Sequence, residues 1–399
     1  MAISNTAQRY GGVTKTFHWV TALLILSLLP LGLFANDLPY DTSEELARKA
    51  WFFSLHKTLG VTVFFVALGR TIWAFTQPKP GLLNADHKVE SFAAETVHWL
   101  LYVALIIVPL SGWIGHAAAA GFAPIWWPFG QGLLLVPKST GVETLFGALH
   151  EVSGKVLFGA VLLHIAGALK HHMIDRDATL RRMLPGDAAM GPLPAQQHTR
   201  APLFSAMIVW ALAIALGGLL ATRGIEAEGT AAVELTEVTS DWQVQEGVIA
   251  ITVVQFGSEV SGSFADWTAA ITFDETIPTG KVGDVIATTN VTSLTLGSVT
   301  QQALGADFFD ADTHPTAVFM ADIHHAVDGF EAVGTLTIKE NSVPLALPFG
   351  LAVTGDQAEM RADLTLDRRD FGIGDNMNDE GGLAFEVKVH ITLKANRGT

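Results

Sequence analysis

The chain has 399 residues, of which 49% are hydrophobic and only 16% are charged, and its formal net charge is −15. The complete lack of cysteine excludes disulfides, iron–sulfur clusters, thiolate-bound haem and covalent c-type haem attachment. Basic residues form no cluster, so nucleic acid is not an expected partner.

Five charge-poor segments in the first half of the chain are long enough to cross a hydrocarbon layer of about 30 Å as helices. They span Phe17–Phe34, about Trp51–Phe75, Val97–Ile114, Leu145–Leu169 and Leu203–Leu220. Lys and Arg are more frequent before the first segment, between the second and third, and between the fourth and fifth. By the positive-inside rule, the N-terminus is expected in the cytoplasm and everything after the fifth segment in the periplasm. The sequence therefore predicts a multi-pass protein of the bacterial inner membrane, with the lipid bilayer as its surroundings.

Besides His98, four histidines lie in these apolar segments, where an ionisable side chain is costly and is first interpreted as functional. His150 and His164 are fourteen positions apart, which returns a helical side chain to within about 40° of its starting direction. With the orientation above, His18 and His164 are expected near the cytoplasmic face, and His56 and His150 near the outer face. Haem iron takes imidazoles from opposite sides of its ring, and helix bundles build such sites between facing helices. The pattern therefore predicts two bis-histidine b-type haems.

Other uses of these histidines remain open at this point. Each could pack or form hydrogen bonds locally near an interface, and the same imidazoles could bind zinc. Zinc is disfavoured because the two sets lie far apart and only Glu151 adds a carboxylate to the segments. His98 begins the third segment at about the depth of His18 and could replace one of the haem ligands.

The motifs around these histidines resemble the prokaryotic cytochrome b561 family of four-helix di-haem membrane proteins. The resemblance covers about residues 5–187, and it is carried by FHWV, LHKTLG, LYVALIIVPLSGW and HEVSG, followed by LLHIAGALKHH and LRRMLPG. It implies that His18, His56, His150 and His164 are the haem ligands. Some members of the family oxidise superoxide at the outer side and pass the electron to ubiquinone, and others are known only as electron carriers.

The resemblance also implies a quinone site near His171, which lies two turns after His164 and matches the family position implicated in quinone binding. An imidazole there could bind a quinone carbonyl or supply a proton. Lys88, in the basic loop before the third segment, is a second quinone candidate. Contact with anionic lipid head groups is the alternative for both residues. Arg70, toward the inner end of the second segment, could neutralise a haem propionate or extend to the interface.

After residue 240 the hydrophobic pattern changes to a period of two, most clearly in FEVKVHITLK. Strands of this kind, separated by Gly, Asp and Asn turns, predict an antiparallel sandwich or barrel. The fold class expected for the whole chain is therefore an all-α membrane bundle, with a fifth transmembrane helix, followed by an all-β antiparallel barrel.

The β region resembles the YceI family of lipocalin-like barrels that bind polyisoprenoid chains. VQFGSEVSGSFADWTAAITFD, GADFFDADTHPTAVF, GTLTIKE and DRRDFGIG carry the resemblance. The sequence departs from the family pattern at Glu340 and at the run Gln301, Gln302 and Ala303. An eight-stranded barrel has room for one slender ligand, and five phenylalanines could line it or simply fill the core: Phe256, Phe264, Phe273, Phe319 and Phe371.

These observations predict four parts: a cytochrome b561-like domain at 5–187, a fifth transmembrane helix at 203–222, a linker at 223–240 and a periplasmic barrel at 241–397. The favoured function is a di-haem oxidoreductase linked to ubiquinone, with superoxide as the favoured donor and a barrel that binds quinone or another polyisoprenoid. One alternative is a membrane-anchored isoprenoid carrier whose cytochrome part is only a relay. Another is a cytochrome for a periplasmic redox partner, with the barrel as a docking module.

Overall fold

The computed structural model describes residues 2–119, 123–186, 193–194, 199–228, 235, 240–297, 299–327 and 329–398. Most of the expected linker, residues 229–234 and 236–239, lies outside the described part. The chain forms two compact units. The first comprises Met1–Leu38, Trp51–Ala118 and Pro124–Ile225, and the second comprises Pro39–Ala50, Ala119–Ala123 and Glu226–Thr399.

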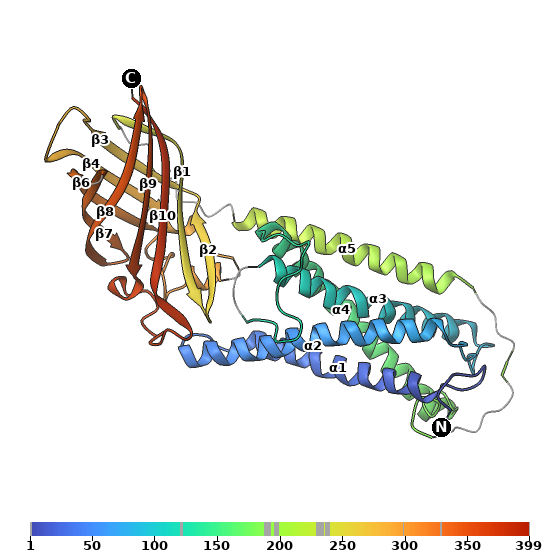
Figure 1. Ribbon diagram of the computed structural model, residues 1–399. Helices are drawn as coiled ribbons and strands as arrows, with labels where there is room; N and C mark the ends of the chain where they lie inside the picture. Colours follow the sequence, from blue (N-terminus) through green and yellow to red (C-terminus); the bar gives the residue numbers. More distant parts are fainter. Residues whose placement is uncertain are drawn as a thin grey trace. The chain divides into compact units, whose positions relative to one another are not determined.

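The first unit is helical (Figure 1). Its helices are α1 (Gly12–Asp37), α2 (Ser43–Phe75, whose first turns belong to the second unit), α3 (Lys88–Ala118), α4 (Thr140–Lys170) and α5 (Ala201–Glu228), and α4 continues into the π-helical turn η1 (His171–Asp175). Five helical spans in the described residues are long and apolar enough to cross a membrane, as expected. A helix satisfies its own backbone polar groups, which lipid cannot do. The chain is therefore a membrane protein.

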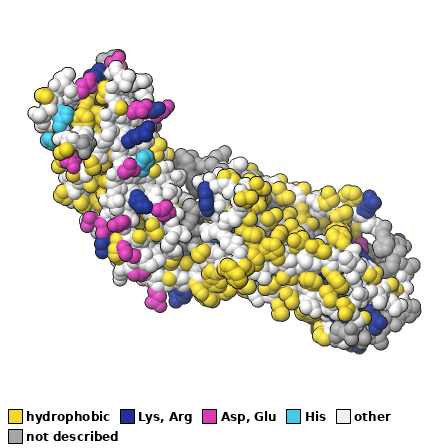
Figure 2. Space-filling view, viewed as in Figure 1, with side chains coloured by type: hydrophobic (Ala, Val, Ile, Leu, Met, Phe, Trp, Pro, Cys, Tyr) yellow, Lys and Arg dark blue, Asp and Glu magenta, His cyan; other side chains and the backbone are white. Residues whose placement is uncertain are grey.

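The helices pack on one another through small and branched side chains. The buried cluster takes Ile25 from α1, Ala67 from α2, Ala104 from α3, Ala160 from α4 and Ala206 from α5. Alanine lets helix backbones approach closely, which is the usual way to pack helices where lipid offers no hydrophobic driving force. The outward faces remain apolar, and Figure 2 shows hydrophobic side chains over the visible face of the helices.

The second unit contains an antiparallel sheet of curled strands (Figure 1), and their inward side chains form an apolar interior. The strand order is β3-β4-β6-β7-β8-β9-β10-β1-β2-β5. The strands run as β1 (Trp242–Gln255), β2 (Ser258–Phe264), β3 (Trp267–Phe273), β4 (Lys281–Asn290), β5 (Leu294–Thr295), β6 (Thr316–Ala326), β7 (Gly329–Ile338), β8 (Asn341–Thr354), β9 (Gln357–Asp367) and β10 (Leu383–Arg397). Short helical turns α6 (Thr300–Leu304), η2 (Val291–Ser293) and η3 (Arg368–Phe371) join them.

The described residues therefore form ten strands, not the eight expected, and one of them, β5, has only two residues. The antiparallel fold class is confirmed. The alternation in β10 is also as expected, because Val387, Val389 and Ile391 line the interior cavity. Lys388 and His390 point the other way, where they are exposed and bind Glu259 and Asp363.

Candidate functional site

The helices bring the four predicted haem-ligand histidines together in two pairs. The imidazole rings of His18 on α1 and His164 on α4 have centroids 6.0 Å apart. Those of His56 on α2 and His150 on α4 are 6.4 Å apart. Since α4 supplies one histidine to each pair, its rise of about 1.5 Å per residue separates the two pairs along the helix by roughly 21 Å.

The spacing within each pair suits one iron atom. A metal–imidazole bond is about 2 Å long, and the ring centroid lies about 1 Å further out, so two imidazoles on opposite sides of one metal have centroids about 6 Å apart. Both observed separations agree with this value. The donor set also fits, because the ligands are imidazoles in an apolar bundle, which is how b-type haem is held.

Two glycines make close contact with the second pair. A Cβ atom at Gly112 on α3 would lie 2.8 Å from Nδ1 of His150, and one at Gly32 on α1 would lie 2.8 Å from Cε1 of His56. A hydrogen bond also orients His150, because its Nδ1 atom is 2.8 Å from the carbonyl oxygen of Val108. Donation of the Nδ1 proton to this carbonyl leaves Nε2 free for a metal, which is the usual way in which a second shell orients a histidine ligand. The sequence analysis missed both glycines. Gly112 lies in the motif LYVALIIVPLSGW, which could have indicated it, whereas Gly32 lies in none of the motifs that resemble the family.

His98 lies beside the first pair. Its ring centroid is 5.1 Å from that of His164, and its Nδ1 atom is 2.7 Å from the carbonyl oxygen of Ala94. The separation is shorter than the roughly 6 Å that an intervening iron requires. The geometry therefore favours His18 over His98 as the partner of His164.

Arg70 on α2 is the residue that the sequence analysis predicts as a partner of a haem propionate. It lies close enough to His18, His98 and His164 to interact with them electrostatically. Its guanidinium carbon is 5.9 Å from the ring centroid of Tyr102. A cation at this position beside the first pair could bind a haem propionate.

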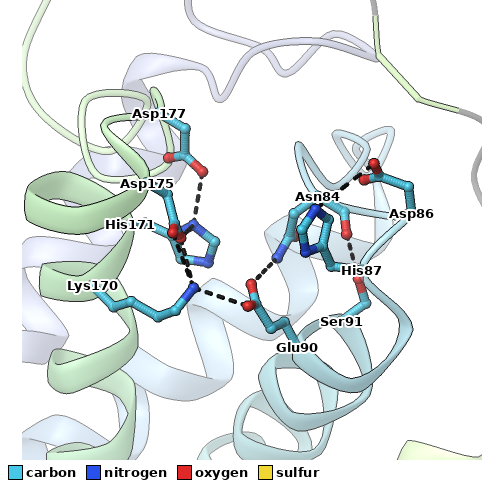
Figure 3. Close-up of polar contacts among 9 residues, drawn as sticks. All are labelled: Asn84, Asp86, His87, Glu90, Ser91, Lys170, His171, Asp175 and Asp177. Atoms are coloured by element: carbon cyan, nitrogen blue, oxygen red, sulfur yellow. Dashed lines mark hydrogen bonds and ion pairs between the residues drawn. The ribbon is translucent and has the colours of Figure 1, made fainter.

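A polar network surrounds His171 at the end of α4 (Figure 3). The Nδ1 atom of His171 is 2.7 Å from Asp177 and 3.2 Å from Asp175. Lys170 bridges Asp175 at 2.8 Å and Glu90 of α3 at 2.9 Å. The π-helical turn brings His171 and Asp175 together, and such turns are frequent at functional sites.

The carboxylate of Asp177 orients His171. Burial raises the pKa of Asp177, but hydrogen bonds from Thr179 and His171 outweigh it, so the pKa lies below its ordinary value. The side chain therefore stays an acceptor for the Nδ1–H of His171, which leaves Nε2 available to another partner. Lys88, the first residue of α3, is exposed and is not among the residues joined in this network.

Carboxylates and an imidazole gather here in a way that could bind a metal ion, because ligand atoms of Glu90, His171 and Asp175 lie within 4.8 Å of one another. The ammonium group of Lys170 contacts two of these three side chains. It already supplies the cation that the carboxylates need. The arrangement is therefore better suited to hold and transfer protons than to bind a metal.

The second unit encloses an apolar cavity of about 210 Å³, far above the roughly 15 Å³ that one water molecule needs. Phe264, Phe319 and Phe371 line it as expected. Phe256 and Phe273 do not belong to its lining. Phe256 has a φ angle of 48° in the β1–β2 turn, and the ring of Phe273 packs 5.2 Å from that of Phe330. The sequence analysis did not single out Phe308 and Phe309, which follow α6 and also line the cavity.

Comparisons with known proteins also divide the chain into two parts, although the second match begins within α5. The family model of prokaryotic cytochrome b561 matches residues 9–186, and the model of the YceI-like domain matches residues 216–395. Cytochrome b561 homolog 2 of Escherichia coli is 30% identical over 188 residues, which are 46% of this chain and 95% of the relative. The probable superoxide oxidase CybB of Yersinia pestis is 23% identical over 185 residues, which are 45% of this chain and 97% of the relative.

The second half is similar to a UPF0312 protein of Pectobacterium carotovorum, with 27% identity over 169 residues that cover 40% of this chain and 86% of the relative. Among solved structures, BcnA of Burkholderia cenocepacia matches with 27% identity and a TM-score of 0.36, over 38% of this chain and 99% of that chain.

Proposed function

Because the chain belongs to the prokaryotic cytochrome b561 family in its first half and carries a YceI-like domain in its second, we propose that it is a di-haem membrane oxidoreductase that passes electrons across the bilayer to ubiquinone or a related quinone. The observation that carries the proposal is the presence of two imidazole pairs, each at the separation that one iron needs. The orientation is that of the positive-inside rule, with the N-terminus in the cytoplasm and the barrel in the periplasm.

In this proposal His18 and His164 hold one haem b, and His56 and His150 hold the other. When bound, each haem supplies a one-electron redox centre. The Val108 carbonyl fixes the tautomer of His150, and Arg70 neutralises a propionate beside the first pair. The two pairs lie roughly 21 Å apart along α4, so two bound haems would offer the electron a path through most of the hydrocarbon layer.

The proposed quinone site lies at His171, near the cytoplasmic end of α4. Reduction of a quinone takes up electrons and protons in equal number, so the site needs a proton donor beside the quinone oxygen. His171 offers Nε2 to a quinone carbonyl while Asp177 holds Nδ1. The Lys170, Glu90 and Asp175 network, part of which reaches the surface, can return a proton to the imidazole after each transfer.

Superoxide is the donor that we propose at the periplasmic end. One relative is named a probable superoxide oxidase. In this chain the Nζ atom of Lys57, adjacent to His56, lies 3.1 Å from Nδ1 of His116. The protonated form of Lys57 beside the second pair would attract an anionic donor. Oxidation of superoxide would release dioxygen and one electron, which a haem held by His56 and His150 would accept.

The test is a pyridine haemochrome assay on the purified full-length protein, followed by rapid mixing with superoxide and then with a short-chain quinone. We expect two b haems per chain, and we expect His56→Ala or His150→Ala to remove one of them. His18→Ala or His164→Ala should remove the other. Fast reduction by superoxide and quinone-dependent reoxidation should both require the full haem content. A colourless preparation after expression with ample haem supply would contradict the proposal.

A second function rests on a different observation, the apolar cavity of the YceI-like unit. In this alternative the protein is a membrane-anchored isoprenoid carrier, and its cytochrome part only relays electrons to a periplasmic partner. Bound prenyl lipid in the purified protein, without turnover of superoxide or quinone, would favour it.

A further inference from the structure

The cavity of the second unit is apolar along most of its wall, but it contains two buried carboxamides with unpaired atoms. Gln255, at the end of β1, is 3% exposed, and its Oε1 atom has no hydrogen-bond partner among the described residues. Gln302, in α6, has a buried Nε2 atom that also lacks a partner within the described part of the chain. Both side chains line the cavity. A buried polar group without a partner costs about 1–3 kcal/mol, so each of these groups needs an explanation.

Gln255 and Gln302 are each linked to the same residues of the cavity wall. Gln255 is paired with Leu383 in the β1–β10 ladder, and Arg368 donates to the carbonyl of the same Leu383. Phe308 packs in one cluster with Leu383. Gln302 lies in α6, and the turn after this helix leads to Phe308, because Gly305 donates to the Gln302 carbonyl and Phe308 donates to that of Gly305. Both glutamines are therefore connected to the part of the wall that contains Leu383 and Phe308.

Arg368 is the cationic residue in the described lining of this cavity, but all of its N–H groups already donate hydrogen bonds within the protein. Its side chain is 3% exposed. Its five N–H groups point to the backbone carbonyls of Ala384, Ile373, Gly374, Met377 and Leu383, at 2.5 to 3.2 Å. Recognition of a phosphate by arginine requires free N–H groups that can form a bidentate contact. Arg368 is therefore a structural residue that ties the η3 turn to β10.

From these observations we propose that the cavity binds a long-chain apolar ligand with an uncharged oxygen-bearing head, a hydroxyl or a carbonyl, which Gln255 and Gln302 recognise, and that it excludes phosphorylated heads. This inference rests on the proposed isoprenoid binding of the YceI-like unit and specifies the class of head group. When the two carboxamides turn toward the cavity, a hydroxyl can donate to the Oε1 atom of Gln255 and accept from the Nε2 atom of Gln302. A diphosphate would lose its hydration and find no free guanidinium donor, which is costly for a charged group.

The experiment measures the binding of three probes to the purified full-length protein. The probes have chains of similar length and differ in the head group: geranylgeraniol, geranylgeranyl diphosphate and a hydrocarbon. We expect the alcohol to bind at least tenfold more tightly than the diphosphate. The variants Gln255→Leu and Gln302→Leu should each weaken binding of the alcohol about fivefold to tenfold, and leave binding of the hydrocarbon unchanged or stronger. Gln301→Leu, at an exposed neighbouring position, is the matched control and should bind all three probes as wild type does.

Both variants are expected to fold, because leucine replaces an unpaired polar group and should leave the ligand-free protein as stable as wild type or more so. Thermal unfolding and haem absorbance check this. The head-group inference would be overturned if the diphosphate bound as tightly as the alcohol or more tightly, or if both variants bound the alcohol as wild type does. Either result would leave isoprenoid binding intact. If none of the three probes bound, isoprenoid binding itself would fail along with it, and the haem assays would be unaffected.

Discussion

The close contact between Gly112 and His150 makes a quantitative prediction about haem binding. In Gly112→Ala the new methyl group would lie 2.8 Å from Nδ1 and 2.9 Å from Cε1 of the imidazole. Carbon contacts are relaxed at about 3.5 Å, so the ring must move by roughly 0.7 Å. Metal–ligand distances tolerate about 0.2 Å. The ring cannot move freely either, because its Nδ1 atom is held by the Val108 carbonyl at 2.8 Å.

Overpacking of this kind costs about 1–3 kcal/mol, which corresponds to a roughly fivefold to 150-fold loss of affinity for the haem that we propose His56 and His150 hold. The assay is a pyridine haemochrome titration with limiting haem, and we expect Gly112→Ala to approach one haem per chain. Gly159→Ala is the control. Nothing lies within 4 Å of a Cβ at Gly159, and its nine-residue separation from His150 places it on the opposite face of α4. Two haems with wild-type affinity in Gly112→Ala would refute the proposed role of His150.

Three further predictions concern other parts of the chain. His98→Leu should retain both haems in the pyridine haemochrome assay, and loss of one would show that His98 is a ligand. Asp177→Asn should slow quinone-dependent reoxidation of the haems by about tenfold or more and change its pH profile without changing haem content, whereas unchanged reoxidation would place the quinone elsewhere. Arg368→Met should lower the free energy of unfolding of the β unit by at least about 3 kcal/mol, since it leaves buried carbonyls without donors. Denaturant unfolding measures this, and Arg369→Met, at an exposed position, should stay close to wild type.

Helical periodicity and the cost of buried ionisable groups were enough to predict the five spans and to pair the histidines. The reason is that α4 carries two of them, so their separation along the chain converts directly into depth. What these rules cannot give is the packing between helices. Gly32 and Gly112 matter because particular imidazoles of other helices approach them, and the position of His98 near His164 was predicted only as a similar depth. Whether His98 could share an iron depends on a difference of about 1 Å, and no pattern in a single sequence carries that information.

In the β unit the same limit appears at the level of register. The alternation of β10 predicted which side chains face inward, because a strand has a period of two. Phe256 and Phe273 show where the rule stops, since one lies in a turn with positive φ and the other packs against a neighbouring aromatic ring. The run that includes Gln302 was visible in the sequence as a departure from the YceI pattern. Its meaning depends on Arg368, whose donors are consumed by five carbonyls that come from different parts of the fold. A cationic residue in a sequence motif therefore does not predict an anion site until its hydrogen bonds are known, and here these bonds support the uncharged ligand that we propose.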